Sequence, residues 1–216
     1  TRRISAPSCM RRALAGRASI EMNGQKPNIL PEWARTIADF QPGDGREAAE
    51  QQEMLTLIER FGDAILTREC AFAHMTASSI IVNRQRTKTL MAYHKIYNSW
   101  AWTGGHMDGE TDFEAAALRE AQEETGISGL KRLGKGAASI EILPVWAHVK
   151  RGKDVGSHLH LNVSYLFEAD DALPLSACED ENSAVGWIEI DKLADSVSEP
   201  PMLPIYRRLL DRANDC

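Results

Sequence analysis

Three glutamates, Glu120, Glu123 and Glu124, stand close together in the stretch ALREAQEETGI, residues 117–127. If this stretch is helical, their i, i+3, i+4 spacing places all three carboxylates on one face of the helix. Like charges at this spacing destabilise an isolated helix by roughly 0.2–0.5 kcal/mol per pair, which suggests a compensating role. Carboxylate oxygens suit Mg²⁺ and Mn²⁺, which also bind waters and substrate phosphates. The cluster therefore indicates a divalent-cation site, with a solvated acidic helix face as the alternative.

The residues around the glutamates predict a helix over 111–127. Thr111 and Glu114 have the spacing of a capping box, which makes Thr111 the expected N-cap. The run of alanines and leucine at 115–118 consists of strong helix formers. Gly126 suits the left-handed position that follows a helix. The carboxylates should therefore project from a rigid, well-capped element.

Periodicity predicts the elements that must position this helix. Apolar residues at i, i+3, i+4 and i+7 indicate a helix over 46–61, and a helix over 202–215 closes the chain. Short apolar or alternating runs predict strands at 78–83, 90–97, 140–150, 157–169 and 184–190, and a further strand ends in Gly104 and Gly105. Strands interleaved with helices make the fold α/β or α+β.

Composition excludes several classes of function. The 216 residues carry a net charge of −6, and residues 1–20 contain five arginines and no acid, so the remainder carries −11. An acidic body does not attract a nucleic-acid backbone. No apolar run approaches 18 residues, so we expect no membrane span. The four cysteines are far apart, which argues against a disulfide framework and fits a reducing, cytoplasmic location. We interpret 1–25 as a disordered basic tail, or as translation from too early a start, rather than as a transit peptide.

The stretch 105–127 resembles the signature of the Nudix hydrolase family, G-x5-E-x7-R-E-U-x-E-E-x-G-U, in which U is a bulky apolar residue. The matching residues are Gly105, Arg119, Glu120, Glu123, Glu124, Gly126 and Ile127. Two positions depart from the signature. Thr111 stands where the signature has its first glutamate, with Glu110 one place earlier as its expected substitute, and Ala121 is smaller than the usual apolar residue.

The resemblance extends over roughly residues 45–210 and is closest to a bacterial subgroup of unassigned substrate. It implies an α/β fold, a Nudix-like α/β/α sandwich around a mixed β-sheet. We accordingly divide the chain into the basic tail (1–25), a helical lead segment (26–65) and the Nudix hydrolase domain (66–216).

The resemblance also implies a Mg²⁺-dependent pyrophosphohydrolase that cleaves a nucleoside diphosphate linked to another moiety, with Mn²⁺ as the alternative ion. It makes Glu120 and Glu124 the principal metal ligands. Glu123 is implied as a third ligand or as the residue that orients the attacking water, and the Gly105 carbonyl as a further metal contact. Arg119 is expected to brace the carboxylates, so the catalytic set is Arg119, Glu123 and Glu124.

His158, His160 and Asn162 alternate along one face of the strand over 157–169. The two histidines are candidates for contacting substrate phosphate or for acid–base chemistry, with a polar strand face as the alternative. Metal coordination by this pair is less favoured, because the sequence nearby offers no third soft ligand. Glu181, in the acidic stretch CEDENS, is a candidate extra metal ligand or general base, with a solvated loop as the alternative.

Three functions remain open at this stage. Besides a hydrolase, the chain could be a binding module without turnover, for which Thr111 is the only support. A diphosphate isomerase of the same fold would need a cysteine in the loop where WTGGH stands. Oxidised nucleotides, nucleotide sugars and nucleoside triphosphates are all compatible substrates, and a homodimer is compatible with the resemblance. Four aromatic residues could stack on a base, although a place in the core is favoured for them: Tyr93, Tyr97, Trp100 and Trp102.

Overall fold

A computed structural model of the chain describes residues 30–95, 98–150, 152–178 and 182–216. The tail predicted for 1–25, the aromatic residue Tyr97 and the candidate Glu181 lie outside these ranges. Within them, no helix is long and apolar enough to cross a membrane.

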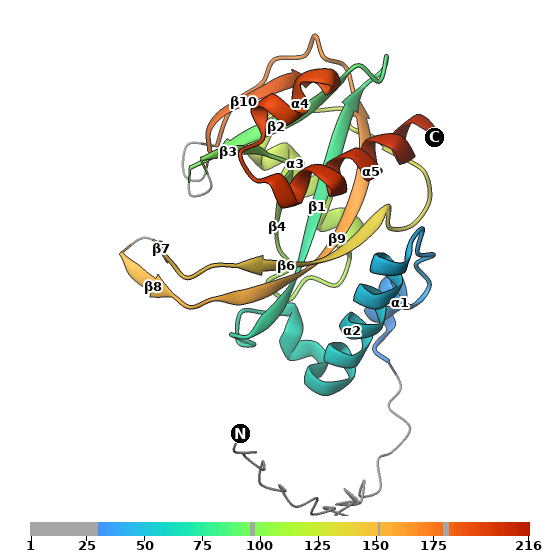
Figure 1. The fold of residues 1–216 in the computed structure, drawn as a ribbon, viewed down its shortest axis with the longest axis vertical. Coiled ribbons are helices and arrows are strands. Elements are labelled where there is room, and N and C mark those ends of the chain that lie inside the picture. Colours follow the sequence, from blue (N-terminus) through green and yellow to red (C-terminus); the bar gives the residue numbers. More distant parts are fainter. Residues whose placement is uncertain (1–29, 96–97, 151, 179–181) are drawn as a thin grey trace, which may run out of the picture.

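The helices are α1 (Arg35–Ala38), α2 (Gly45–Phe61), α3 (Phe113–Thr125), α4 (Leu193–Ser196) and α5 (Leu203–Asn214). The strands are β1 (Ala73–Asn83), β2 (Lys88–His94), β3 (Ser99–Ala101), β4 (Thr103–His106), β5 (Lys131–Leu133), β6 (Ser139–Val145), β7 (His148–Lys150), β8 (Lys153–Val155), β9 (His158–Ala169) and β10 (Asn182–Glu189). Helices α1 and α2 precede the strands, α3 lies between β4 and β5, and α4 and α5 follow β10 (Figure 1). Single 3₁₀ segments cover Glu32–Ala34, Gly62–Leu66, Ile190–Lys192 and Pro200–Met202.

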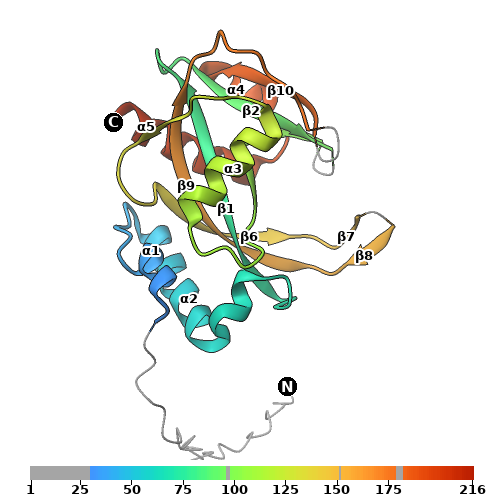
Figure 2. The ribbon, with the colours of Figure 1, turned by 180° about the vertical axis from the view of Figure 1, so that it is seen from behind.

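Eight of these strands form one mixed sheet. Strands β10, β2, β1, β9 and β5 are neighbours in that order, while β3 pairs with β2, β4 with β1, and β6 with β9. Strands β1 and β9 run parallel along their lengths, and the other pairs are antiparallel. Helix α5 covers one face of the sheet and α3 covers the other (Figures 1 and 2). The predicted α/β/α sandwich around a mixed sheet is therefore confirmed.

The central strand β1 separates two hydrophobic clusters. Ile81 belongs to the cluster that contains Phe113 of α3, whereas Ile80 and Val82 belong to the cluster that contains Leu209 of α5. Successive side chains of a strand point to opposite faces, so β1 is buried on both sides. This explains the consecutive apolar residues at 80–82 of this strand.

The lead segment packs into the same core as α3. Trp33, Ile37, Met54 and Ile58 are buried in the cluster that contains Phe113, and the rings of Trp33 and Phe113 lie 6.1 Å apart. Burying side chains of this size contributes roughly 1.5–3 kcal/mol each, so helices α1 and α2 add substantially to the hydrophobic core.

Glu47 is a fully buried charge that joins α2 to α5. Its two carboxylate oxygens each accept a hydrogen bond from Arg212, both at 2.7 Å. One of them also accepts from the Ser139 hydroxyl at 2.8 Å. Burial raises the pKa of Glu47, but the hydrogen bonds from Arg212, the Gly43 amide and Ser139 outweigh it, so the net pKa lies below its ordinary value.

The strand predicted over 140–150 is wrong in its second half. Strand β6 ends at Val145, and His148 begins β7, which pairs only with β8 in a separate two-stranded sheet. This hairpin projects from the main sheet (Figure 1), and Trp146 at its base is 78% exposed. The residue pattern favours extended backbone on both sides of Trp146, but it does not show where the chain leaves one sheet for another.

Candidate active site

Helix α3 carries the three glutamates and is capped one residue later than predicted. Its N-cap is Asp112, which has extended backbone angles and accepts a hydrogen bond from the Ala115 amide at 3.0 Å. The prediction that Thr111 caps the helix is therefore wrong; aspartate is as good an N-cap as threonine, and the helix begins at Phe113. Gly126 ends the helix in the left-handed conformation with φ of 66°, as predicted.

Small residues seat α3 against β1 and β4. Ala117 and Ala121 are fully buried. A larger apolar residue at Ala121, as the signature has, would need more space between helix and sheet. The short side chains bring the helix backbone close to the sheet, so that the glutamates on its flank reach the two glycines of β4.

Glu124 is held at both oxygens by donors from two strands. Its Oε1 accepts from the Gly104 amide at 2.7 Å, and its Oε2 accepts from Asn182 Nδ2 at 2.6 Å. The side chain is buried, with 8% exposure. Hydrogen bonds to a carboxylate are charge-assisted and favour its ionised form. Glu124 is therefore a carboxylate whose orientation is fixed by hydrogen bonds from two strands.

The carboxyl group of Glu120 lies directly over Gly105. A Cβ atom placed on Gly105 would lie 2.6 Å from Glu120 Oε2 and closer still to its Oε1 and Cδ. Only glycine leaves this space free, because any side chain begins with a Cβ. Gly105 itself sits in β4 opposite Ala77 of β1. The spacing between the first glycine and Glu120 thus has a direct steric reason.

Arg119 braces the carboxylates around it. Its Nη1 donates to Glu120 Oε1 at 2.8 Å and to Glu123 Oε2 at 3.3 Å, and its Nη2 donates to Glu110 Oε2 at 3.3 Å. Partial burial opposes its charge, but the hydrogen bond to Glu120 and the other nearby carboxylates raise the pKa of Arg119 above its ordinary value. Glu110, the residue before Thr111, thus supplies a carboxylate that contacts Arg119.

The donor set suits a hard divalent cation. Glu120 and Glu124 present carboxylate oxygens beside Gly105, and the more exposed Glu123 lies one place before Glu124 on the same helix. Oxygen donors held in this way match the preference of Mg²⁺ and Mn²⁺ for carboxylates. The glycine at 105 leaves space beside Glu120 that a Cβ would fill. The residues present therefore fit such an ion.

A cleft of about 350 Å³ opens beside Glu124 and Gly105 and brings four of the predicted site residues together, whereas Arg119, Glu120 and Glu123 are not among its described lining residues. Glu124, Gly104 and Gly105 line one part of it, and His158 and His160 line another. The two candidate histidines and the carboxylate helix thus share one cavity. Burial, followed by the charges of neighbouring histidines, lowers the pKa of His160 to about 2, so this imidazole is neutral at physiological pH.

Sequence reasoning missed three residues that line this cleft or support it. Asn182, next to the predicted Glu181, holds Glu124, and His74 and His106 line the cleft with the predicted histidines. The acidic stretch CEDENS contains Asn182 and so indicated this place in the chain, while the candidate Glu181 itself lies outside the described residues. No local motif surrounds His74 or His106, because their neighbours come from β9.

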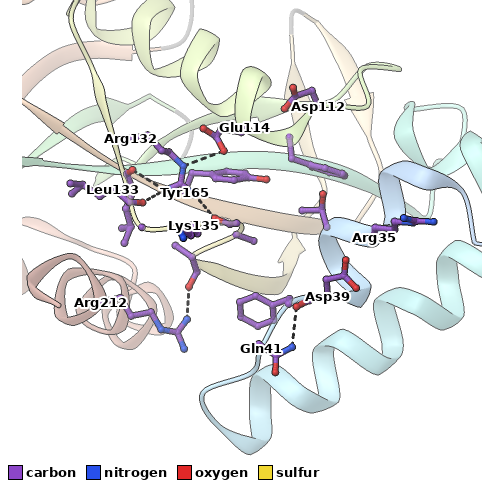
Figure 3. Close-up of a pocket in the computed structure, with 18 of the residues that line it drawn as sticks. Arg35, Asp39, Gln41, Asp112, Glu114, Arg132, Leu133, Lys135, Tyr165 and Arg212 are labelled. Atoms are coloured by element: carbon purple, nitrogen blue, oxygen red, sulfur yellow. Dashed lines mark hydrogen bonds and ion pairs between the residues drawn. The ribbon is translucent and has the colours of Figure 1, made fainter. Parts of the chain in front are cut away.

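A larger cavity, of about 1190 Å³, lies elsewhere and is lined by Asp112 and Glu114 at the start of α3, together with Arg35, Arg132, Lys135 and Arg212 (Figure 3). None of its described lining residues is Glu120, Glu123 or Glu124. Size alone does not identify an active site, so the smaller cleft, which holds the oriented carboxylate, is the better candidate.

The aromatic residues near the cleft pack mainly on the core, as favoured. Trp102 makes an edge contact with Tyr206 at 5.4 Å, and Trp100 makes one with Tyr93 at the same distance. Trp102 also lines the cleft. Of Tyr93, Trp100 and Trp102, only Trp102 is therefore placed to contact a ligand in the cleft.

Comparison with known proteins gives the family. The family model described as the NUDIX domain matches residues 73–212, more than half of the chain. The chain belongs to the Nudix hydrolases, and it is a hydrolase that acts on pyrophosphate bonds of nucleoside diphosphate derivatives. Members of this family generally use divalent cations. No curated protein matches the sequence.

The chain is similar to several solved structures at low sequence identity. The dihydroneopterin triphosphate pyrophosphohydrolase of E. coli has a TM-score of 0.50 and 12% identity, over 66% of this chain and 96% of that one. A NUDIX-family hydrolase from Clostridium perfringens has a TM-score of 0.45 and 21% identity, over 64% and 96% of the two chains. An Ap4A hydrolase from C. elegans has a TM-score of 0.44 and 18% identity, over 62% and 93%.

Proposed function

We propose that this chain is a Mg²⁺-dependent pyrophosphohydrolase that cleaves a nucleoside diphosphate linked to another moiety, with Mn²⁺ able to replace Mg²⁺. The observation that carries the proposal is the pair of carboxylates, Glu120 and Glu124, held against the two glycines of β4 at the edge of a cleft. A bound divalent ion would neutralise the diphosphate and lower the pKa of the attacking water. Glu120 and Glu124 are the residues that would hold it, with Glu123 and the Gly105 carbonyl as further contacts.

Each residue of the chain has a distinct role in this proposal. Glu124 keeps a fixed orientation because Gly104 and Asn182 donate hydrogen bonds to its two oxygens. Glu123 has an exposed carboxylate, 58% accessible, that can accept a proton from the attacking water at Oε. Arg119 donates hydrogen bonds to both Glu120 and Glu123. Its positive charge offsets the repulsion between the two carboxylates and holds them close together. His158 and His160 form the wall of the cleft against which we place the substrate.

The test is a turnover screen on nucleoside triphosphates, nucleotide sugars, ADP-ribose and dinucleotides with Mg²⁺ or Mn²⁺. Released phosphate is measured with and without added phosphatase. Glu120→Gln and Glu124→Gln should abolish metal-dependent turnover, whereas Glu53→Gln, an exposed glutamate of α2, should leave it unchanged as a control for the loss of one charge. Thermal denaturation of each variant shows whether it is folded.

A binding module without turnover is the second candidate, because Thr111 departs from the signature. Its distinguishing result is Mg²⁺ binding that Glu124→Gln removes, with no hydrolysis of any compound by the wild-type chain. In that case Thr111→Glu should create activity if the missing glutamate is the cause. Turnover by the wild-type chain would reject this candidate.

A further inference from the structure

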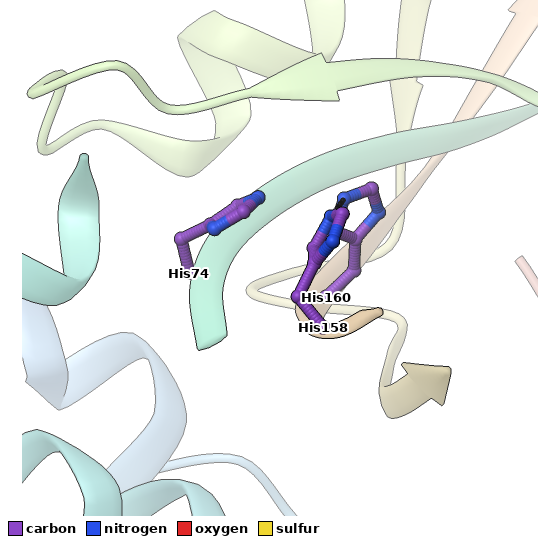
Figure 4. A group of neighbouring side chains, drawn as sticks. All are labelled: His74, His158 and His160. Carbon is purple, nitrogen blue, oxygen red and sulfur yellow. Dashed lines mark hydrogen bonds between the residues drawn. The ribbon is translucent and has the colours of Figure 1, made fainter. Parts of the chain in front are cut away.

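We propose that His74, His158 and His160 form a second metal site, for a transition-metal ion of the Zn²⁺ class, in the cleft that Glu124 of α3 also lines. The three side chains each offer one ring nitrogen, and these atoms lie within 4.8 Å of one another. Figure 4 shows the ring of His74 directed toward those of His158 and His160. Ion binding at this site stands independently of the proposed function.

The parallel pairing of β1 with β9 creates the cluster. His74 lies directly opposite His160 in the register of these strands. His158 is two residues before His160, so the two side chains leave the same face of β9. Three imidazoles that are separated by up to 86 positions in sequence therefore converge at one end of the parallel pair. This supplies the third ligand that the sequence around His158 and His160 lacks.

Hydrogen bonds orient two of the three rings as metal ligands require. His74 Nδ1 lies 3.3 Å from the carbonyl oxygen of Cys70, and His158 Nδ1 lies 2.8 Å from that of Gly156. A carbonyl only accepts, so each Nδ1 carries its proton and each neutral ring keeps the lone pair on Nε2. Metal-bound histidines use this arrangement, in which a backbone carbonyl holds the other ring nitrogen.

The spacing of the Nε2 atoms matches ligands of one ion. His158 Nε2 and His160 Nε2 lie 3.2 Å apart. Two nitrogens bound at 2.0–2.1 Å to a tetrahedral centre are separated by roughly 3.3 Å. A single shared proton would also explain this one distance, but it leaves Nε2 of His74 without a partner. A metal ion would engage all three rings.

His74 supplies the independent observation. Its side chain is 95% buried, and its Nε2 has no hydrogen-bond partner among the described residues. Leaving a buried polar group unsatisfied is costly, so such groups usually mark an unseen ligand, ion or water. The ring that carries this atom is directed toward the two other imidazoles (Figure 4). A cation that accepts three lone pairs satisfies it.

The chemistry of the donors separates this site from the carboxylate site. Imidazole nitrogens favour Zn²⁺, Co²⁺ or Ni²⁺, whereas carboxylates favour Mg²⁺ and Mn²⁺. Three histidines leave the fourth position of a tetrahedral ion open, as in sites where the ion acts on a ligand. All three line the cleft of about 350 Å³, so the open position suits an anionic oxygen of a molecule in that cleft. Only this last role rests on the proposed function.

In the experiment, the full chain is freed of metal and titrated with Co²⁺, and the visible absorption spectrum is recorded at each addition. We expect one tightly held ion with the intense bands of tetrahedral Co²⁺, displaced by stoichiometric Zn²⁺. His158→Gln should weaken Co²⁺ binding at least tenfold. His148→Gln removes a histidine of the same cleft that is not among the three, and it should have no effect. Glu120→Gln should lose Mg²⁺-dependent hydrolysis and keep the Co²⁺ bands.

Two results would overturn the site: a wild-type chain that shows no tetrahedral Co²⁺, or bands that persist in His158→Gln and vanish in Glu120→Gln. If His158→Gln does not fold, X-ray absorption at the zinc edge of the wild-type protein decides the question. Three imidazole ligands support the proposal, and a shell of oxygen atoms alone rejects it. Hydrolysis with Mg²⁺ is measured separately, so a failed zinc site and a failed hydrolase give different results.

Discussion

Gly105→Ala is the substitution that best tests whether the position of Glu120 matters for activity. A Cβ at residue 105 would lie 2.6 Å from Glu120 Oε2 and nearer to two other atoms of that carboxyl group, whereas ordinary contact begins at 3.4 Å. The carboxyl group must therefore retreat by about 1 Å. Because it is the end of a flexible side chain, it can move without moving the backbone.

The expected effect is a loss of catalysis without a loss of folding. Mg²⁺ requires near-ideal octahedral geometry, with bonds of 2.0–2.1 Å, so it tolerates a displaced ligand poorly. A misplacement of about 1 Å costs on the order of 10²-fold in rate, which corresponds to about 2.7 kcal/mol. Gly105 does not have a positive φ, so alanine also restricts the unfolded chain and returns roughly 0.4–1 kcal/mol of stability.

The assay combines kcat/KM across a Mg²⁺ titration with urea unfolding. We expect kcat/KM to fall about 10²-fold and the Mg²⁺ concentration for half-maximal activity to rise, while the free energy of unfolding changes by less than about 1 kcal/mol. Gly45→Ala is the matched control, because a Cβ there meets nothing within 4 Å. A Gly105→Ala protein with wild-type activity, beside an inactive Glu120→Gln, would refute the steric argument.

Three further substitutions separate folding from function. Gly104→Ala places a Cβ 2.6 Å from a backbone oxygen of β1, and it should lower the free energy of unfolding in urea by about 1–3 kcal/mol. Asn182→Ala removes the 2.6 Å hydrogen bond to Glu124, and Mg²⁺ titration should show affinity or activity reduced about 10–100-fold. Arg212→Met leaves the buried charge of Glu47 poorly paired and should cost about 3 kcal/mol at pH 7. The native pKa of Glu47 is below its unfolded value near 4.3, so its contribution to stability is present above about pH 4.3 and is lost as pH falls through the native pKa. The loss of stability in Arg212→Met should therefore become smaller in acid. A loss that does not depend on pH would contradict this pairing.

Local sequence determined the helix that carries the carboxylates. The 3.6-residue period places Glu120, Glu123 and Glu124 on one face whatever surrounds the helix, and Gly126 ends it because glycine adopts positive φ. The spacing between Gly105 and the helix residues also indicates the family from sequence alone. The N-cap was misassigned by one residue, because Thr111 and Asp112 are both good caps and the choice depends on how the loop enters the helix.

Only the tertiary structure decided which distant residues complete the site. Asn182 meets Glu124 across 58 positions, and His74 meets His160 through the register of a parallel strand pair. Parallel pairing is a long-range choice that hydrophobic periodicity does not encode, since the same apolar run fits several neighbours. Helix caps and helix faces follow from neighbouring residues, whereas the wall of the cleft exists only once β1 and β9 lie side by side.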